Sequence, residues 1–177
     1  MSDTLITIVA ILLAAILMFV FPLMSVAERT DDMSSLSVQT ATTEFVDNSR
    51  AVGKITLDNY QKLVSTLQAT GNTYDIEIEV KILDENVGKK SAWTTGTVIG
   101  ENIYYSVYTA QIMEVLTADN GTSTYNMSEG DIISVSVKNT NKTMAQTIRG
   151  AFYSISGNDT YQISAQHSGI VTATGSN

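Results

Sequence analysis

Few side chains in this sequence have the chemistry for catalysis. The chain of 177 residues contains one His and no Cys, which excludes thiol nucleophiles, iron–sulfur clusters, zinc–thiolate sites and disulfides. A histidine-based catalytic set would have to use His167, which is followed by Ser168 and Gly169. A nucleophile reaches its base through space, so adjacency along the chain does not indicate such a pair. We expect His167 to be a turn or surface residue near the last strand, and the protein not to be an enzyme.

Acidic side chains are the remaining candidates for metal binding. Two pairs of neighbouring carboxylates could hold a surface calcium ion: Asp31 with Asp32, and Asp84 with Glu85. The loop that begins at Asp119 lacks the EF-hand pattern, because Thr124 stands where that loop needs Gly and Gly130 stands where it needs a bidentate Glu. The simpler interpretation is that these carboxylates are solvated, so the sequence predicts no metal site and no cofactor.

Two further patterns also have ordinary explanations. Asn-X-Ser/Thr triplets begin at Asn120, Asn126, Asn141 and Asn158. Ser and Thr make up almost a quarter of the chain, so such triplets arise by chance and indicate only exposed loops. A group of aromatic residues could form a ligand platform: Trp93, Tyr104, Tyr105 and Tyr108. Aromatic residues at strand or helix spacing more often belong to the core, which is the interpretation we adopt.

The first segment is a candidate membrane anchor. No residue from Thr4 to Ala27 is charged, and the stretch is almost wholly apolar. About 20 helical residues cross a hydrocarbon core of about 30 Å, so this stretch is long enough. A cleaved signal is the alternative, since Ser25-Val26-Ala27 before Glu28 supplies the small residues of a cleavage site. The start of the chain lacks a basic region and the apolar run exceeds the usual signal length, so we predict a retained anchor at residues 4–27.

We predict the orientation of this anchor from the composition of the chain, because the positive-inside rule decides little here. Arg29 and the terminal amine are the positive charges that the rule can weigh, and they decide little. The absence of Cys, the many Ser, Thr and Asn residues, and an acidic collar at Glu28, Asp31 and Asp32 favour export. We expect a single-pass protein of the cell membrane with its C-terminal domain outside. A net charge of −8 argues against nucleic-acid binding.

An amphipathic helix is predicted to follow the anchor. A stripe recurs at three- and four-residue spacing between Ser34 and Val52: Val38, Ala41, Thr42, Phe45, Val46, Ser49 and Val52. Gly53 suits the end of this helix, and the positive charge of Lys54 suits the negative C-terminal end of the helix dipole. Residues 28–56 thus form a stalk or amphipathic helix. The anchor and this segment are either one rod of about 48 residues and about 72 Å, or two parts joined by a flexible link at 28–35.

Residues 57–177 are predicted to form a small exported α+β domain, because helices and strands mix without a regular βαβ repeat. Thr56 can cap a helix over 57–68, and apolar residues alternate with charged ones over 74–82, as in a half-buried strand. The further expectations, in chain order, are a turn at 84–90, a strand at 93–99, a helix over at least 109–116, a polar loop at 119–129, a strand at 132–138, a helix with its stripe at Met144, Ile148, Phe152 and Ile155 that stops at Gly157, and strands at 161–165 and 170–174.

The order of these parts resembles a known family. A charge-poor N-terminal helix that continues into an amphipathic helix and then a compact domain looks like type IV pilins and pseudopilins. The stretches 45–47, 53–56, 70–74, 130–131 and 157–161 resemble minor pilins of the tight-adherence type in Gram-positive bacteria. The resemblance implies a membrane-anchored assembly subunit. Type IV pilins carry a Glu in the apolar stretch and a short basic leader, neither of which residues 1–27 show, so we expect neither processing by a prepilin peptidase nor a major-pilin role.

Three classes of function follow from these observations. The leading hypothesis is a non-enzymatic structural component of a pilus-like or secretion-associated envelope assembly, whose N-terminal helix packs against copies of itself or other subunits. The alternative is a monomeric membrane-tethered binding or adhesion module. An anchored hydrolase is disfavoured by the scarcity of His and the absence of Cys.

Overall fold

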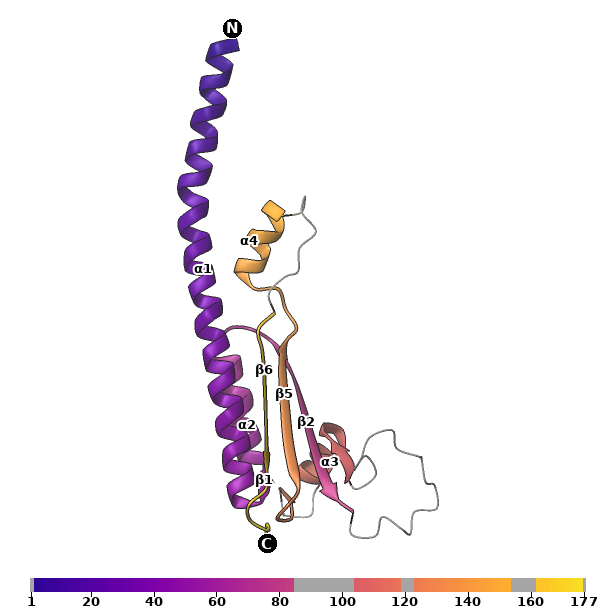
Figure 1. Cartoon of the computed structure of the whole chain (residues 1–177). Helices are drawn as coiled ribbons and strands as arrows, with labels where there is room; N and C mark the ends of the chain where they lie inside the picture. Colours follow the sequence, from indigo (N-terminus) through magenta and orange to yellow (C-terminus); the bar gives the residue numbers. More distant parts are fainter. Residues whose placement is uncertain (1, 85–103, 119–122, 154–161, 177) are drawn as a thin grey trace, which may run out of the picture.

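The computed structural model describes residues 2–84, 104–118, 123–153 and 162–176. Within these ranges, a long N-terminal helix is followed by a small domain of helices and antiparallel sheets (Figure 1), which confirms the α+β fold class. The turn expected at 84–90, apart from its first residue, and the strand expected at 93–99 lie outside the described residues.

The N-terminal helix α1 runs without a break from Ser2 to Val52. Its 51 residues make a rod of about 76 Å (Figure 1). The rod is therefore the correct alternative for residues 28–35, rather than a flexible link. Hydroxyl groups help here, because Thr30 Oγ1 donates to the carbonyl of Val26 and Ser34 Oγ donates to that of Thr30. Those bonds satisfy the polar side chains without interrupting the helix.

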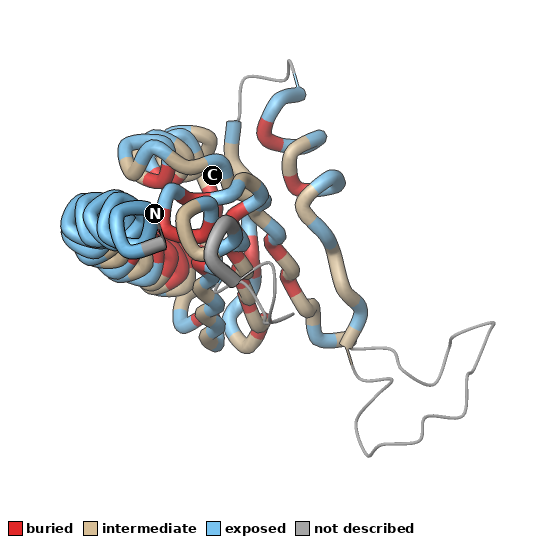
Figure 2. Tube along the Cα trace, turned by 90° about the horizontal axis from the view of Figure 1, so that it is seen from above, coloured by how far each residue is buried: buried red, intermediate tan, exposed pale blue. Residues whose placement is uncertain are grey.

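The two halves of α1 have different surroundings. Figure 2 looks along the helix: its N-terminal turns are exposed, and buried residues appear where its second half meets the domain. The predicted stripe is buried at Val38, Thr42, Phe45, Val46 and Ser49. Val52 was expected on this stripe but is 46 % exposed, because the chain turns away at Gly53. Gly53 ends the helix as predicted, with a φ of 72° that suits glycine.

The main sheet is antiparallel, with the strand order β3-β2-β5-β6. Its strands are β2 (Tyr74–Leu83), β3 (Tyr104–Tyr108), β5 (Ile132–Asn139) and β6 (Ser164–Ile170). One face buries Ile78, Val80, Ile133, Val135 and Val137, in agreement with the predicted alternation. The second half of α1 packs mainly against β6 and also against β5.

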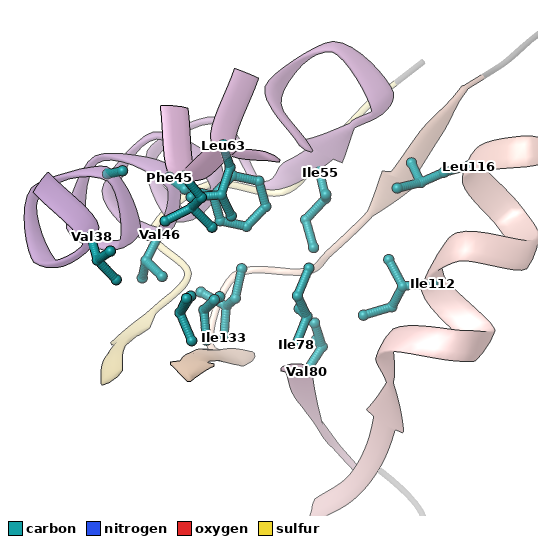
Figure 3. Packing of buried hydrophobic residues seen from close by; sticks show 14 of the residues in the cluster. Val38, Phe45, Val46, Ile55, Leu63, Ile78, Val80, Ile112, Leu116 and Ile133 are labelled. Carbon is teal, nitrogen blue, oxygen red and sulfur yellow. The ribbon is translucent and has the colours of Figure 1, made fainter. Parts of the chain in front are cut away.

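Two helices complete this core. Helix α2 (Leu57–Gln68) has the predicted bounds and cap, since the Thr56 hydroxyl accepts the Asn59 N–H at 3.2 Å. Helix α3 (Thr109–Thr117) follows β3, so the strand ends where the helix was expected to begin. Figure 3 shows Phe45 and Leu63 on one side of the core, with Ile112 and Leu116 of α3 on the other.

A second, two-stranded sheet corrects two sequence predictions. Strand β1 (Lys54–Thr56) pairs with β4 (Thr124–Asn126). Lys54 was expected to complete the end of α1 but begins β1. The region 119–129 was expected to be a loop, yet it contains β4. Strand β4 has three residues, which is too few to show a periodic pattern in the sequence. It is held in place by its pairing with β1.

The end of the chain differs most from the prediction. One strand, β6, replaces the two expected at 161–165 and 170–174, and His167 lies inside it rather than in a turn. The strand is continuous because it pairs with β5 from Ser164 to Ile170. It also lies so close to α1 that a Cβ at Gly169 would meet Arg50 Cδ at 2.7 Å. Small and polar residues fill this strand, so it lacks the apolar alternation of β2.

Helix α4 (Met144–Tyr153) exists as predicted but presents a different face. Met144 was expected on the buried stripe and is 62 % exposed, whereas Ala145 and Gln146 are buried. Polar contacts with α1 set this orientation in place of an apolar stripe. Ile148 of the same stripe is half-buried, and the Phe152 side chain, Ile155 and Gly157 lie outside the described residues.

Candidate functional site

The structure separates His167 from Ser168. Consecutive strand residues point to opposite faces, and here His167 is half-buried toward α1 while Ser168 is exposed. His167 Nε2 lies 3.5 Å from Asp47 Oδ1, which also accepts the Arg50 Nε–H at 2.8 Å. These three partly exposed side chains join α1 to β6. Their arrangement is that of a packing contact between two elements.

The first carboxylate pair, Asp31 and Asp32, is divided between different surroundings. Asp31 is 7 % exposed and its Oδ2 accepts the hydroxyl hydrogen of Thr143 at 2.7 Å, whereas Asp32 is exposed. Glu85 lies outside the described residues, so its pairing with Asp84 is not seen. Within the described ranges, no group of three or more His, Cys, Asp or Glu side chains is arranged to hold a metal ion.

The Asn triplets and the aromatic residues do not form a common site among the described residues. Asn126 is exposed in β4, while Asn141 accepts the Thr73 N–H at 2.8 Å and donates to Asn72 Oδ1 at 3.0 Å. Tyr105 and Tyr108 were expected in the core but are 49 % and 52 % exposed, because β3 is an edge strand. Tyr104 is half-buried in the same strand, and the other members of both sets lie outside the described residues: Asn120, Asn158 and Trp93.

Among the described residues, three side chains have shifted pKa values, and burial or a neighbouring charge explains each. Burial, and then the charge of Asp75, raises the pKa of Tyr60. Burial also raises the pKa of Tyr125, with smaller contributions from Tyr105 and Asp131. The pKa of Lys62 is raised by its hydrogen bond to Glu44 and the charge of that group. Such shifts can mark catalytic sites, but none of these three belongs to a cleft with a nucleophile and a base.

The largest exposed feature is the apolar first half of α1. It is the helix of the described residues that is long and apolar enough to cross a membrane, and the domain leaves that stretch uncovered. The predicted anchor at residues 4–27 lies wholly within it. Lipid is the surrounding that would satisfy such a surface.

An exposed apolar stripe continues from this half into the second half of α1. We define the α1 stripe as residues spaced by seven, with one neighbour added at its end: Leu5, Leu12, Phe19, Val26, Met33 and Leu36. Each step of seven residues falls about 20° short of two helical turns, so the stripe turns gradually around α1 and Leu36 lies about 140° from Leu5. Met33 and Leu36 are 74 % and 64 % exposed although they lie beyond the charged collar. These two side chains face away from the domain, about 120–180° around the helix from the buried Val38 and Phe45.

A collar of polar contacts separates the two halves. Arg149 Nη2 of α4 lies 2.6 Å from Glu28 Oε1 of α1, and Thr143 bonds Asp31 beside it. Thr143 and Gln146 also cap α4 reciprocally, since Thr143 N–H donates to Gln146 Oε1 and Gln146 N–H donates to Thr143 Oγ1. Helix α4 thus covers one side of α1 and leaves the α1 stripe open.

The cap of α4 and the α1 stripe were not predicted, although each has a signal in the sequence. The Thr-X-X-Gln pattern at 143–146 is a capping box that marks the start of a helix. The stripe is visible as an apolar residue at every seventh position from Leu5 to Met33. What the sequence did not show is which face of α1 the domain covers.

No protein-family model, curated protein or solved structure matches this chain.

Proposed function

We propose that this protein is a non-enzymatic structural subunit of a pilus-like or secretion-associated envelope assembly. It is held in the cell membrane by the first half of α1, with its domain outside the cell. The observation that carries the proposal is the α1 stripe, which continues beyond the charged collar to Met33 and Leu36. A helix that only tethers a domain needs an apolar surface in the bilayer and nowhere else.

The mechanism of assembly is helix packing. In the bilayer, close van der Waals contact between helices supplies association, and the small residues Ala14 and Ala15 allow near approach. Beyond the collar, water surrounds the helix, so burial of Met33 and Leu36 supplies about 1.5–3 kcal/mol for each side chain. The continuous rod holds Met33 on the same side of α1 as Ala15, about five turns earlier, so one neighbouring helix can contact both, which fixes the register between subunits.

Cysteine crosslinking in native membranes tests this proposal, because the chain has no Cys of its own. We expect Met33→Cys to form a disulfide-linked dimer on mild oxidation at least fivefold more than Gln39→Cys. Gln39 is the matched control, since it is exposed on the same helix but lies about 100° or more from the centre of the α1 stripe.

Detergent extraction followed by sizing supplies the second measurement. An assembly subunit is expected to elute as an oligomer that Met33→Glu with Leu36→Glu converts to monomer. A strictly monomeric wild type with equal crosslinking at both cysteine positions would contradict the assembly. That result would favour a membrane-tethered binding or adhesion module instead.

A further inference from the structure

A groove lies beside α1 at the level where its apolar half ends. It is bounded on one side by α1 from Leu23 to Asp31, and on the other by the loops 70–72 and 141–144. Its volume is about 320 Å³. Val26 belongs both to the groove and to the edge of the α1 stripe, whereas Ala27, Thr30 and Asp31 lie on the side of α1 that faces the two loops.

The lining of the groove changes in polarity along the helix. Leu23, Val26 and Met144 supply apolar surface, and all three are exposed. Farther along α1 the lining is polar, with Thr30 and Asp31 on the helix and Asn72, Asn141 and Lys142 on the loops. An apolar part directed toward the anchor and a polar part directed toward the domain match the change from acyl chain to headgroup in a phospholipid.

The depth of the groove agrees with this match. About 20 helical residues cross the hydrocarbon core, and 20 residues counted from Thr4 end at Leu23. The predicted anchor continues to Ala27, so the groove straddles the boundary: Leu23 and Val26 lie at the edge of the hydrocarbon, and Thr30 and Asp31 lie at the level of the headgroups. Helix α4 lies alongside α1 and reaches toward the N-terminal half from the same level (Figure 1).

The charges in the groove fit the same ligand. Lys142 is exposed and contributes an ammonium group, the natural partner of a phosphate diester. Asp31 contributes a carboxylate, but it is buried and bonded to Thr143. The amide groups of Asn72 and Asn141 bond each other at 3.0 Å and hold the two loops in place as one wall.

We propose that this groove binds one membrane phospholipid, with an acyl chain along Leu23 and Val26 and the phosphate beside Lys142. The inference rests on the membrane anchorage in the proposed function. Bound lipid would seat the domain at a fixed height above the bilayer, because the loop 141–144 also contains Thr143, which bonds Asp31 of α1.

A photoreactive phosphatidylcholine tests the site in the full chain. Its diazirine lies on the acyl carbon next to the ester, and the protein is reconstituted in phosphatidylcholine nanodiscs. We expect labelled peptides from the anchor and also from the loop 141–144. Thr30→Trp fills the groove and is expected to reduce loop labelling at least fivefold, whereas Thr40→Trp, an exposed Thr farther along α1, is the control and leaves it unchanged.

A second variant protects the test against misfolding. Lys142→Gln removes one surface charge, keeps the side-chain length similar, and is expected to lower loop labelling about fivefold, while Lys138→Gln does not. Anchor labelling with no loop labelling, or loop labelling that persists in Thr30→Trp and Lys142→Gln, would overturn the lipid site and leave the anchorage intact. Labelling of neither region would overturn the anchorage itself.

Discussion

At the residue scale, the buried carboxylate of Asp131 links two parts of the domain through hydrogen bonds. Asp131 is 3 % exposed, its Oδ2 accepts the Ser128 N–H at 2.7 Å, and its Oδ1 accepts the Leu83 N–H at 3.3 Å. These bonds join the turn before β5 to the end of β2. A buried charge is tolerated only when such donors surround it.

Replacing this carboxylate should therefore cost stability. Asp131→Ala leaves two backbone N–H groups without their acceptor, so we expect the free energy of unfolding to fall by about 3 kcal/mol, as judged from hydrogen bonds to charged groups. Urea unfolding of the full chain in detergent micelles measures the change. Glu129→Ala, an exposed acidic residue nearby, is the control and should change stability by less than about 0.5 kcal/mol. Equal unfolding midpoints for the two variants would rule out this role for Asp131.

Two partly buried tyrosines predict the behaviour at alkaline pH. Burial raises the pKa of Tyr60 and Tyr125 above 10.0 in the folded chain. Above pH 10 the unfolded chain then holds fewer protons than the folded one, so stability is present below that pH and is lost as pH rises. We expect Tyr125→Phe to flatten this loss, since Phe has no proton to release. Unfolding midpoints at about pH 9 and about pH 11 give the slope, and an unchanged slope would contradict the role of Tyr125.

At the element scale, the junction after α1 is the tightest point in the fold. Gly53 ends α1, its carbonyl accepts the Met127 N–H at 2.8 Å, and the C-terminal segment passes directly beside it. A Cβ at Gly53 would collide with the carbonyl oxygen of Ala173 and lie 2.6 Å from Gly175 N. Both the backbone angle and the space thus require glycine.

A matched pair of glycines separates these two requirements. Gly71 has a similar φ of 79°, but a Cβ there would meet nothing within 4 Å. We expect Gly71→Ala to cost about 1–2 kcal/mol from its left-handed backbone alone. Gly53→Ala should cost at least about 2 kcal/mol more, because neighbouring backbone must also move. Thermal unfolding of both variants measures the difference, and similar costs would show that the junction is less crowded than the structure indicates.

At the scale of the whole molecule, α1 belongs to both the anchor and the core. Its first half is exposed and apolar, while Val38, Phe45 and Val46 of its second half lie in the core of the domain. Because the helix has no break between these halves, movement of one must move the other. A force on the domain would reach the membrane through a rigid rod.

The rod predicts a single intramolecular distance. Spin labels at Leu12→Cys and Thr40→Cys are 28 residues apart, which corresponds to about 42 Å along a continuous helix. Pulsed electron resonance in nanodiscs, with the doubly labelled chain diluted in unlabelled protein, is expected to give one narrow peak near this value. A broad distribution would mean that the segment 28–35 bends. Labels at Thr40 and Asn48, both within the folded half, provide the rigid reference.

The sequence by itself determined the elements that have a strong local signal. The charge-free run to Ala27, the cap at Thr56 and the alternation of β2 each depend on neighbouring residues, so the bounds of α2 and nearly those of β2 could be predicted. The continuity of α1 through the collar was left open, because Glu28–Ser35 is compatible with either a helix or a link. The function, the export of the domain and its assembly remain predictions.

Only the tertiary structure decided which surfaces are covered. Strand β6 has no strong pattern of its own and is held by β5 and α1, and β4 exists through its pairing with β1. The same holds for α4, where Arg149 contacts Glu28, Thr143 just before the helix contacts Asp31, and Met144 is left exposed. Periodicity reports what a segment could bury, whereas the partners far along the chain determine what it does bury. That is why the exposed α1 stripe and the groove beside it were recognised only in the folded molecule.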